Sequence, residues 1–141
     1  MESLLREILL DHVKAPKNRG EISDATYSAN SNNPVCGDVV KIDIKIENGI
    51  VSKIGTSGQG CAISQASMSI FSQEIDGISV EEIQKKVLTF KSLFDGSINS
   101  ADNLSEQAQL LKFLENNPSK IRCAMLSWSA LNDVINEQGI N

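Results

Sequence analysis

The sequence contains few cysteines that could cross-link the fold and few basic residues that could bind nucleic acid. It has three cysteines and one histidine among 141 residues. A framework in which every cysteine is disulfide-bonded is excluded, because three thiols cannot all pair within one chain. Basic residues are also sparse: 13 Lys and Arg oppose 18 Asp and Glu, and none of them form a cluster. An acidic chain binds phosphate backbones poorly, so we expect no nucleic-acid partner.

Long apolar runs are absent too, so we expect no membrane partner. Residues 1–7 follow an amphipathic helical pattern and lack the order of a signal peptide. A small, odd number of cysteines without such a signal favours a reducing, cytoplasmic location, where free thiols persist. The length and the ordinary apolar share of 40% predict a single domain over residues 1–141.

Hydrophobic periodicity in the first half predicts one helix followed by strands. Apolar residues recur at helical spacing from Leu4 to Val13, and Pro16 ends that segment. Residues 27–33 are expected to form a short strand. A strict alternation at 40–46 predicts a second strand, and residues 50–55 return from an Asn-Gly turn as a third. Residues 55–60 carry three glycines and are expected to form a loop.

The second half predicts helices. They are expected from Cys61 to Asp76, from a capping box at Ser79 and Glu82, over about 104–114, and from Asn117-Pro118 onward. Residues 96–103 are polar and are expected to form a loop. The order predicts an α+β fold, in which a small antiparallel three-stranded sheet packs against about five helices.

Each of the three cysteines could have a purely structural role, because free cysteine often only fills space in a core. Their settings suggest more. Cys36 lies at a turn before the alternating strand, and Cys61 stands where a glycine-rich segment enters a helix. Cys123 follows Arg122 in the first turns of the last helix. A helix N-terminus or a fixed positive charge favours thiolate over thiol, so all three positions predict a stabilised thiolate.

Three thiolates need a fourth donor to complete a tetrahedral zinc site. Asp38 is two positions from Cys36 on an extended chain, so both side chains leave the same face. His12 competes for that place, since imidazole also binds zinc. We favour Asp38 and expect His12, near the end of the first helix, to have a cap or surface role.

Three motifs occur in order along the chain: Asn-Pro-Val-Cys-Gly-Asp at 33–38, Gly-Gln-Gly-Cys-Ala-Ile-Ser at 58–64, and Arg-Cys-Ala-Met-Leu-Ser-Trp at 122–128. Together they resemble the iron–sulfur assembly proteins of the IscU/NifU N-terminal superfamily. Scaffolds of the IscU kind carry histidine where this chain has Arg122, and they have a shorter segment between the second and third cysteines. Residues 77–103 look like the insertion of the SufU branch, so the chain resembles that branch more.

The resemblance implies a zinc-dependent sulfurtransferase. By match of motif, Cys36, Asp38, Cys61 and Cys123 are the expected zinc ligands. Cys36 is the expected acceptor of persulfide sulfur from a SufS-type cysteine desulfurase, released when a partner histidine takes its place, and the sulfur would pass to a downstream iron–sulfur assembly complex. We expect Arg122 to offset part of the negative charge of this site. The alternatives are a scaffold for a [2Fe–2S] cluster and a structural zinc domain that serves as an adaptor.

Overall fold

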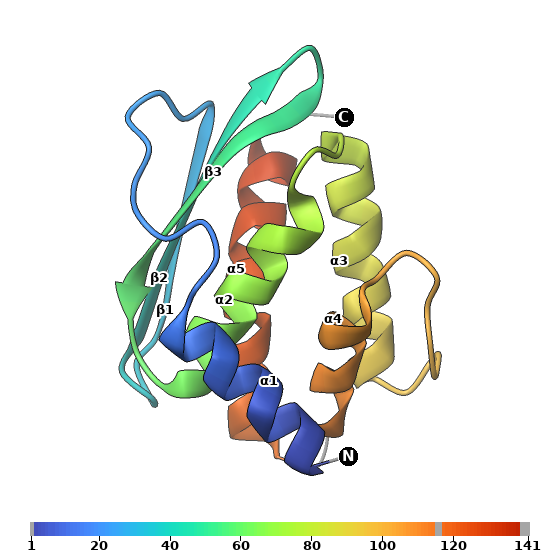
Figure 1. The fold of residues 1–141 in the computed structure, drawn as a ribbon. Coiled ribbons are helices and arrows are strands. Elements are labelled where there is room, and N and C mark those ends of the chain that lie inside the picture. Colours follow the sequence, from blue (N-terminus) through green and yellow to red (C-terminus); the bar gives the residue numbers. More distant parts are fainter. Residues whose placement is uncertain (1, 115–116, 139–141) are drawn as a thin grey trace.

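A three-stranded antiparallel sheet forms one side of the molecule in the computed structural model, which describes residues 2–114 and 117–138 (Figure 1). Its strands lie in the order β1 (Tyr27–Asn33), β2 (Asp38–Glu47) and β3 (Ile50–Gln59). The helices are α1 (Glu2–Lys14), α2 (Ala62–Ile75), α3 (Val80–Phe94), α4 (Glu106–Leu110), the 3-10 turn η1 (Leu111–Leu114) and α5 (Pro118–Glu137). The predicted α+β fold, with a three-stranded sheet and about five helices, is confirmed.

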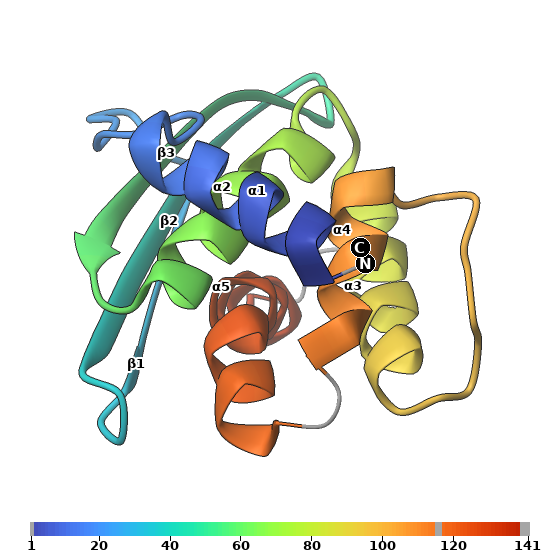
Figure 2. The ribbon, with the colours of Figure 1, turned by 60° about the horizontal axis from the view of Figure 1, so that its bottom comes forward.

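The elements form layers that both ribbon views show. Helices α2 and α5 pack against one face of the sheet, and α3 and α4 lie on the side of these helices that faces away from the sheet (Figures 1 and 2). Helix α1 contacts α2 and α4. Helix α2 is thus surrounded by other elements, which explains why most of its residues are apolar or small.

Strand β3 is longer than the sequence predicts. Residues 55–59 were expected in a loop because of their glycines, but they continue the β2 ladder, with Ser57 opposite Lys41 and Gln59 opposite Val39. The other edge of β3 is also engaged. The Gly20 N–H donates to the Thr56 carbonyl at 2.7 Å. Backbone pairing on both sides therefore overrides the weak strand propensity of glycine.

The helix boundaries follow local signals in most places. Ser79 and Glu82 form the predicted capping box, and the Asn117 side chain accepts a hydrogen bond from the Lys120 N–H, with Pro118 at the first helical position. The helix expected over 104–114 is shorter. It begins after its cap at Ser105 and tightens into the 3-10 turn η1 from Leu111.

Aromatic side chains join α2, α3 and α5 at the centre of the core. The Trp128 ring stacks on Phe90 with centroids 3.7 Å apart, and Phe71 lies 4.6 Å from it. The buried Trp128 Nε1–H donates to the Ser67 hydroxyl at 3.1 Å, and Ser67 donates to the Ala124 carbonyl at 2.5 Å. These contacts hold α5 against α2, which matters because both helices carry site residues.

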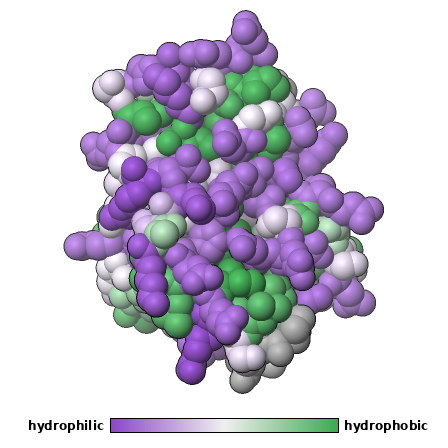
Figure 3. Space-filling model, viewed as in Figure 1, coloured by the Kyte–Doolittle hydropathy of each residue, from purple (hydrophilic) through white to green (hydrophobic). Residues whose placement is uncertain are grey.

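The surface view of Figure 3 is mostly hydrophilic, and its apolar areas are divided into separate patches. Exposed large apolar side chains are spread over several elements: Leu4, Leu10, Val13, Val35, Val39, Ile50, Leu88 and Phe113. Within residues 2–114 and 117–138, no helix combines the length and the apolar character that a membrane crossing needs.

Candidate metal centre

Cys36 lies in the turn that joins β1 to β2, as the sequence predicts. The Cys36 N–H donates to the Asn33 carbonyl at 3.2 Å, and the Asn33 side-chain oxygen accepts from the Val35 N–H at 3.3 Å. Gly37 has a φ of +71°, which lets the chain reverse before β2 begins. The turn leaves Cys36 half-buried, while Val35 is 75% exposed. The thiol is therefore carried by a short segment at the edge of the structure.

Asp38 is the first residue of β2 and is 1% exposed. Its Oδ1 accepts hydrogen bonds from the Cys61 N–H at 2.7 Å and from the Ser64 hydroxyl at 3.1 Å. Burial acts to raise the pKa of the Asp38 carboxyl, but hydrogen bonds from the Cys123 thiol, from Cys61 and from Ser64 outweigh it, so the pKa is lowered. Asp38 is thus a carboxylate held in a fixed orientation, as a metal ligand needs to be.

Two glycines make room for Asp38 and its strand. A Cβ atom on Gly60 would lie 2.3 Å from the Asp38 Oδ1, and one on Gly58 would lie 2.0 Å from the Val39 carbonyl oxygen. Both glycines have positive φ angles, +153° and +126°. The glycine-rich segment before Cys61 therefore has a physical role, which is close approach of backbone to the carboxylate.

Cys61 is the N-cap of α2, and its Sγ accepts a hydrogen bond from the Ser64 N–H at 3.4 Å. This confirms the predicted position at a helix N-terminus. The Cys61 Sγ lies 3.8 Å from the Asp38 Oδ2. Helix α2 therefore presents both the thiol and the backbone N–H of one residue to the same carboxylate.

Cys123 lies on α5 and is 2% exposed. Burial raises the pKa of the Cys123 thiol well above its ordinary value, and the neighbouring Asp38, Cys36 and Cys61 raise it further. The prediction of a thiolate stabilised by its surroundings is wrong for Cys123. Negative neighbours and low solvation favour the thiol, and only a cation bound beside the sulfur would reverse that preference.

These four residues meet in one place, although they come from four elements. Single ligand atoms of Cys36, Asp38 and Cys123 lie within 4.8 Å of one another. Cys61 is outside that closer group and adjoins it through its Sγ, 3.8 Å from the Asp38 Oδ2. We call Cys36, Asp38, Cys61 and Cys123 the ligand group. Three sulfurs and one carboxylate are a donor set that suits a tetrahedral cation such as zinc, so the residues present fit such an ion.

Arg122 makes no direct contact with the ligand group among the described residues, so the charge offset expected of it stays a prediction. It is exposed and lines a groove with Met125 and Asp133 beside β1. Among the described residues it takes part in no side-chain hydrogen bond or ion pair. Because α5 turns by about 100° per residue, the neighbour of an inward-facing Cys123 is directed elsewhere.

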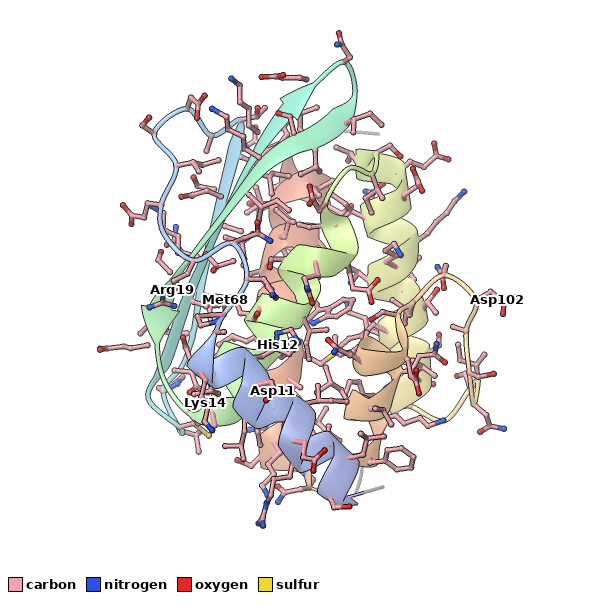
Figure 4. The ribbon with its side chains drawn as sticks, viewed as in Figure 1. Asp11, His12, Lys14, Arg19, Met68 and Asp102 are labelled. Carbon is pink, nitrogen blue, oxygen red and sulfur yellow. The ribbon has the colours of Figure 1, made fainter. Side chains whose placement is uncertain are left out.

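His12 is not at the surface, which corrects the prediction made for it. It is 5% exposed, with its Nδ1 2.7 Å from the Ser69 hydroxyl and its Nε2 2.7 Å from the Gln107 side-chain oxygen. Figure 4 shows His12 extending from α1 toward α2. The Lys17 N–H also donates to Ser69. Both ring nitrogens are therefore engaged in joining α1 to α2 and α4.

Sequence reasoning missed three polar residues around the ligand group. Ser64 donates to Asp38, the Asn33 Nδ2 lies 3.7 Å from the Cys123 Sγ, and the Ser119 hydroxyl lies 3.6 Å from the Cys36 Sγ. Ser64 carried a local signal, since it stands three positions after the capping residue. Asn33 and Ser119 carried none, because tertiary contacts alone bring them to the sulfurs.

Comparison with known proteins finds relatives over nearly the whole chain. The Bacillus subtilis (strain 168) protein named "Zinc-dependent sulfurtransferase SufU" is 33% identical over 147 residues, which cover 100% of this chain and 96% of that protein. The Streptococcus pyogenes protein named "Iron-sulfur cluster assembly scaffold protein IscU" is 32% identical over 135 residues, which cover 96% of this chain and 84% of that protein.

A solved structure has the same fold. The Fervidobacterium islandicum protein, assigned as an iron–sulfur cluster assembly scaffold protein for the SUF system, superposes with a TM-score of 0.84 at 25% identity. The match covers 92% of this chain and 94% of that one. Residues 5–138 also match the family described as "NifU-like N terminal domain". The chain therefore belongs to the family of NifU-like N-terminal domains.

Proposed function

We propose that this protein is a zinc-dependent sulfur-transfer protein that serves iron–sulfur cluster assembly. The observation that carries the proposal is the ligand group itself: the Cys36 and Cys123 sulfurs and the Asp38 carboxylate lie within 4.8 Å of one another, and the Cys61 Sγ lies 3.8 Å from the same carboxylate. Cys36 is half-buried on a turn. The similarity to the Bacillus subtilis SufU protein supports the same function. The sulfur donor is proposed to be the persulfide of a SufS-type cysteine desulfurase.

The proposed zinc ligands are Cys36, Asp38, Cys61 and Cys123. Bound zinc would keep the thiols deprotonated while lowering their nucleophilicity, so it would protect a reactive sulfur until it is needed. Asp38 and Cys123 are buried and held by hydrogen bonds, and Cys61 begins a helix. These three residues are suited to remain as ligands while Cys36 moves.

Cys36 is the proposed sulfur acceptor. Its Sγ attacks the terminal sulfur of the donor persulfide, a new S–S bond forms on Cys36, and the S–S bond of the donor breaks. The donor cysteine leaves as a thiolate and takes up the proton that Cys36 gives up, so no other oxidant or reductant is required. The turn at 34–37 suits this role because its exposed residues can move without disturbing β2.

A protein partner is consistent with one hollow in the surface, although no residue of the ligand group lines it. An open cavity of about 800 Å³ lies between α1, η1 and α5, and its walls combine apolar Leu9 and Phe113 with charged Arg6 and Lys120. Mixed apolar and charged surfaces are typical of transient interfaces. We propose that the chain acts as one domain in the cytoplasm and passes sulfur to a downstream assembly complex.

The test is a desulfurase turnover assay with radiolabelled cysteine. Wild-type protein should raise turnover and acquire label, and Cys36→Ala should do neither. Val35→Ala changes the same exposed turn and should behave as wild type. Full stimulation by Cys36→Ala would refute the acceptor assignment. Absence of label on the wild-type protein would instead favour the adaptor role.

A second candidate is a scaffold for a [2Fe–2S] cluster, which would be cargo of this site. The similarity to the Streptococcus pyogenes IscU protein favours it, and cysteine thiolates bind iron–sulfur clusters as readily as zinc. Metal analysis of protein purified without reconstitution separates the two. Colourless protein with about one zinc per chain supports sulfur transfer. Brown protein with iron and sulfide supports the scaffold.

A further inference from the structure

Ser119 contacts the sulfur of the ligand group that lies on a turn. Its hydroxyl oxygen lies 3.6 Å from the Cys36 Sγ. Ser119 is one helical turn before Cys123 on α5, so both residues point toward Cys36 from the same face of the helix. Ser119 is exposed, Cys36 is half-buried and Cys123 is buried. The three side chains are therefore ordered by exposure, from buried Cys123 through half-buried Cys36 to exposed Ser119.

The Ser119 hydroxyl is not required to begin α5. Asn117 is the N-cap and satisfies the Lys120 N–H, and Pro118 fills the first helical position. The other polar contacts of the ligand group point inward, since Ser64 donates to Asp38 and Asn33 lies beside Cys123. Among the described residues outside the ligand group, Ser119 is the one whose side chain is within hydrogen-bond reach of the Cys36 sulfur.

We propose that Ser119 is a positioning residue that holds the sulfur-bearing Cys36 on the solvent side of the ligand group. This inference rests on the proposed function, in which Cys36 accepts sulfur. After transfer, the Ser119 O–H donates to the terminal, anionic sulfur of the Cys36 persulfide, one S–S bond beyond the Sγ that Ser119 contacts in the structure. A sulfur bound to a metal shares its electrons with it, whereas a persulfide presents an unshared anionic sulfur and is the stronger acceptor. Ser119 therefore favours the loaded state.

The position on α5 adds to this effect. Ser119 lies in the first turn of a 20-residue helix, where the backbone carries partial positive charge. Serine offers one hydroxyl donor that rotates freely, so it can follow the sulfur as Cys36 changes position. An alanine would keep the helix and remove only the donor. The contribution of Ser119 can thus be separated from that of the fold.

The test is a sulfur-exchange equilibrium on the full, metal-loaded chain. Protein is mixed with glutathione persulfide and glutathione at a series of ratios, and mass spectrometry of intact protein gives the fraction that carries one added sulfur. The exchange conserves sulfur: the Cys36 thiol and glutathione persulfide become the Cys36 persulfide and glutathione. Ser119→Ala should lower the equilibrium constant about five-fold, the effect of one hydrogen bond of ordinary net strength.

Three comparisons make the result decisive. Ser119→Thr retains a hydroxyl and should restore most of the equilibrium constant, which a purely structural role would not predict. Ser129→Ala, on the same helix, should match wild type. Metal content should be the same in all four proteins. Equal constants for wild type and Ser119→Ala would overturn this inference and leave the proposed function standing. A wild-type protein that takes no sulfur on Cys36, either from glutathione persulfide or from the desulfurase, would overturn both.

Discussion

The two sides of the ligand group differ in how firmly they are held. Asp38 and Cys123 are 1% and 2% exposed, and each is contacted by side chains from other elements. Cys36 is half-buried on a turn, and its outer neighbour Ser119 is exposed. On the proposed function, the inner side would retain a metal ion while the outer side changes. The comparison therefore predicts that retention of metal and reactivity of sulfur can be separated by mutation.

The largest expected effect comes from Asp38→Ala on the inner side. It removes a charged acceptor from the Cys61 N–H and from the Ser64 hydroxyl, which keeps only the Cys61 carbonyl as a partner. Loss of two charge-assisted hydrogen bonds should lower the unfolding free energy by about 3 kcal/mol. The variant should also lose bound metal. Urea denaturation of chelator-treated protein and metal analysis measure the two effects. Asp43→Ala, a buried carboxylate on the same strand, should retain metal. If Asp38→Ala bound as much metal as wild type, Asp38 would not be a metal ligand.

Gly60→Ala tests the same side without removing a ligand. The added Cβ would lie 2.3 Å from the Asp38 Oδ1, so the carboxylate must shift. We expect a loss of about 2 kcal/mol in unfolding free energy, from strain at a positive φ and from this contact, together with weaker metal binding. Gly77→Ala is the matched control, because Gly77 also has a positive φ but no neighbour within 4 Å. Equal metal affinity in both variants would show that the close approach is unimportant.

His12→Ala tests whether a buried histidine outside the ligand group affects stability without affecting metal binding. Loss of the hydrogen bonds to Ser69 and Gln107 should lower the unfolding free energy by about 1.5 kcal/mol. Metal content should not change, because neither ring nitrogen contacts the ligand group. Asp11→Ala, next to it and exposed, should be neutral (Figure 4). If His12→Ala lost metal, His12 would again be a candidate metal ligand.

The smallest effect on stability is expected for Cys36→Ser on the outer side. The residue lies in a turn and is only half-buried, so the unfolding free energy of the metal-free protein should change by less than about 0.5 kcal/mol. Sulfur acceptance should nevertheless be abolished. Thermal denaturation after chelation and the turnover assay described above measure the two quantities. A large loss of stability would mean that Cys36 is as firmly held as Cys123.

Local patterns predicted much of the fold. The alternation of β2, the capping box at Ser79 and the Asn117-Pro118 start of α5 depend on interactions within a few residues, and all are confirmed. The prediction that residues 55–60 form a loop was wrong, because β3 gains hydrogen bonds from two neighbours that are distant in sequence. The surface role expected for His12 was wrong for the same reason, since its partners lie on α2 and α4.

The sequence alone determined the chemistry available to this protein: three thiols, a carboxylate two positions after the first, and glycines that permit close backbone approach. Those properties follow from residue type and short spacing. Tertiary structure decided which groups meet and how each is solvated. Burial raises the pKa of Cys123, and Arg122 lines a neighbouring groove in place of the site itself. Solvation and long-range contact depend on the whole fold, so no local motif could have specified that Cys123 is buried while Cys36 and Cys61 are half-buried.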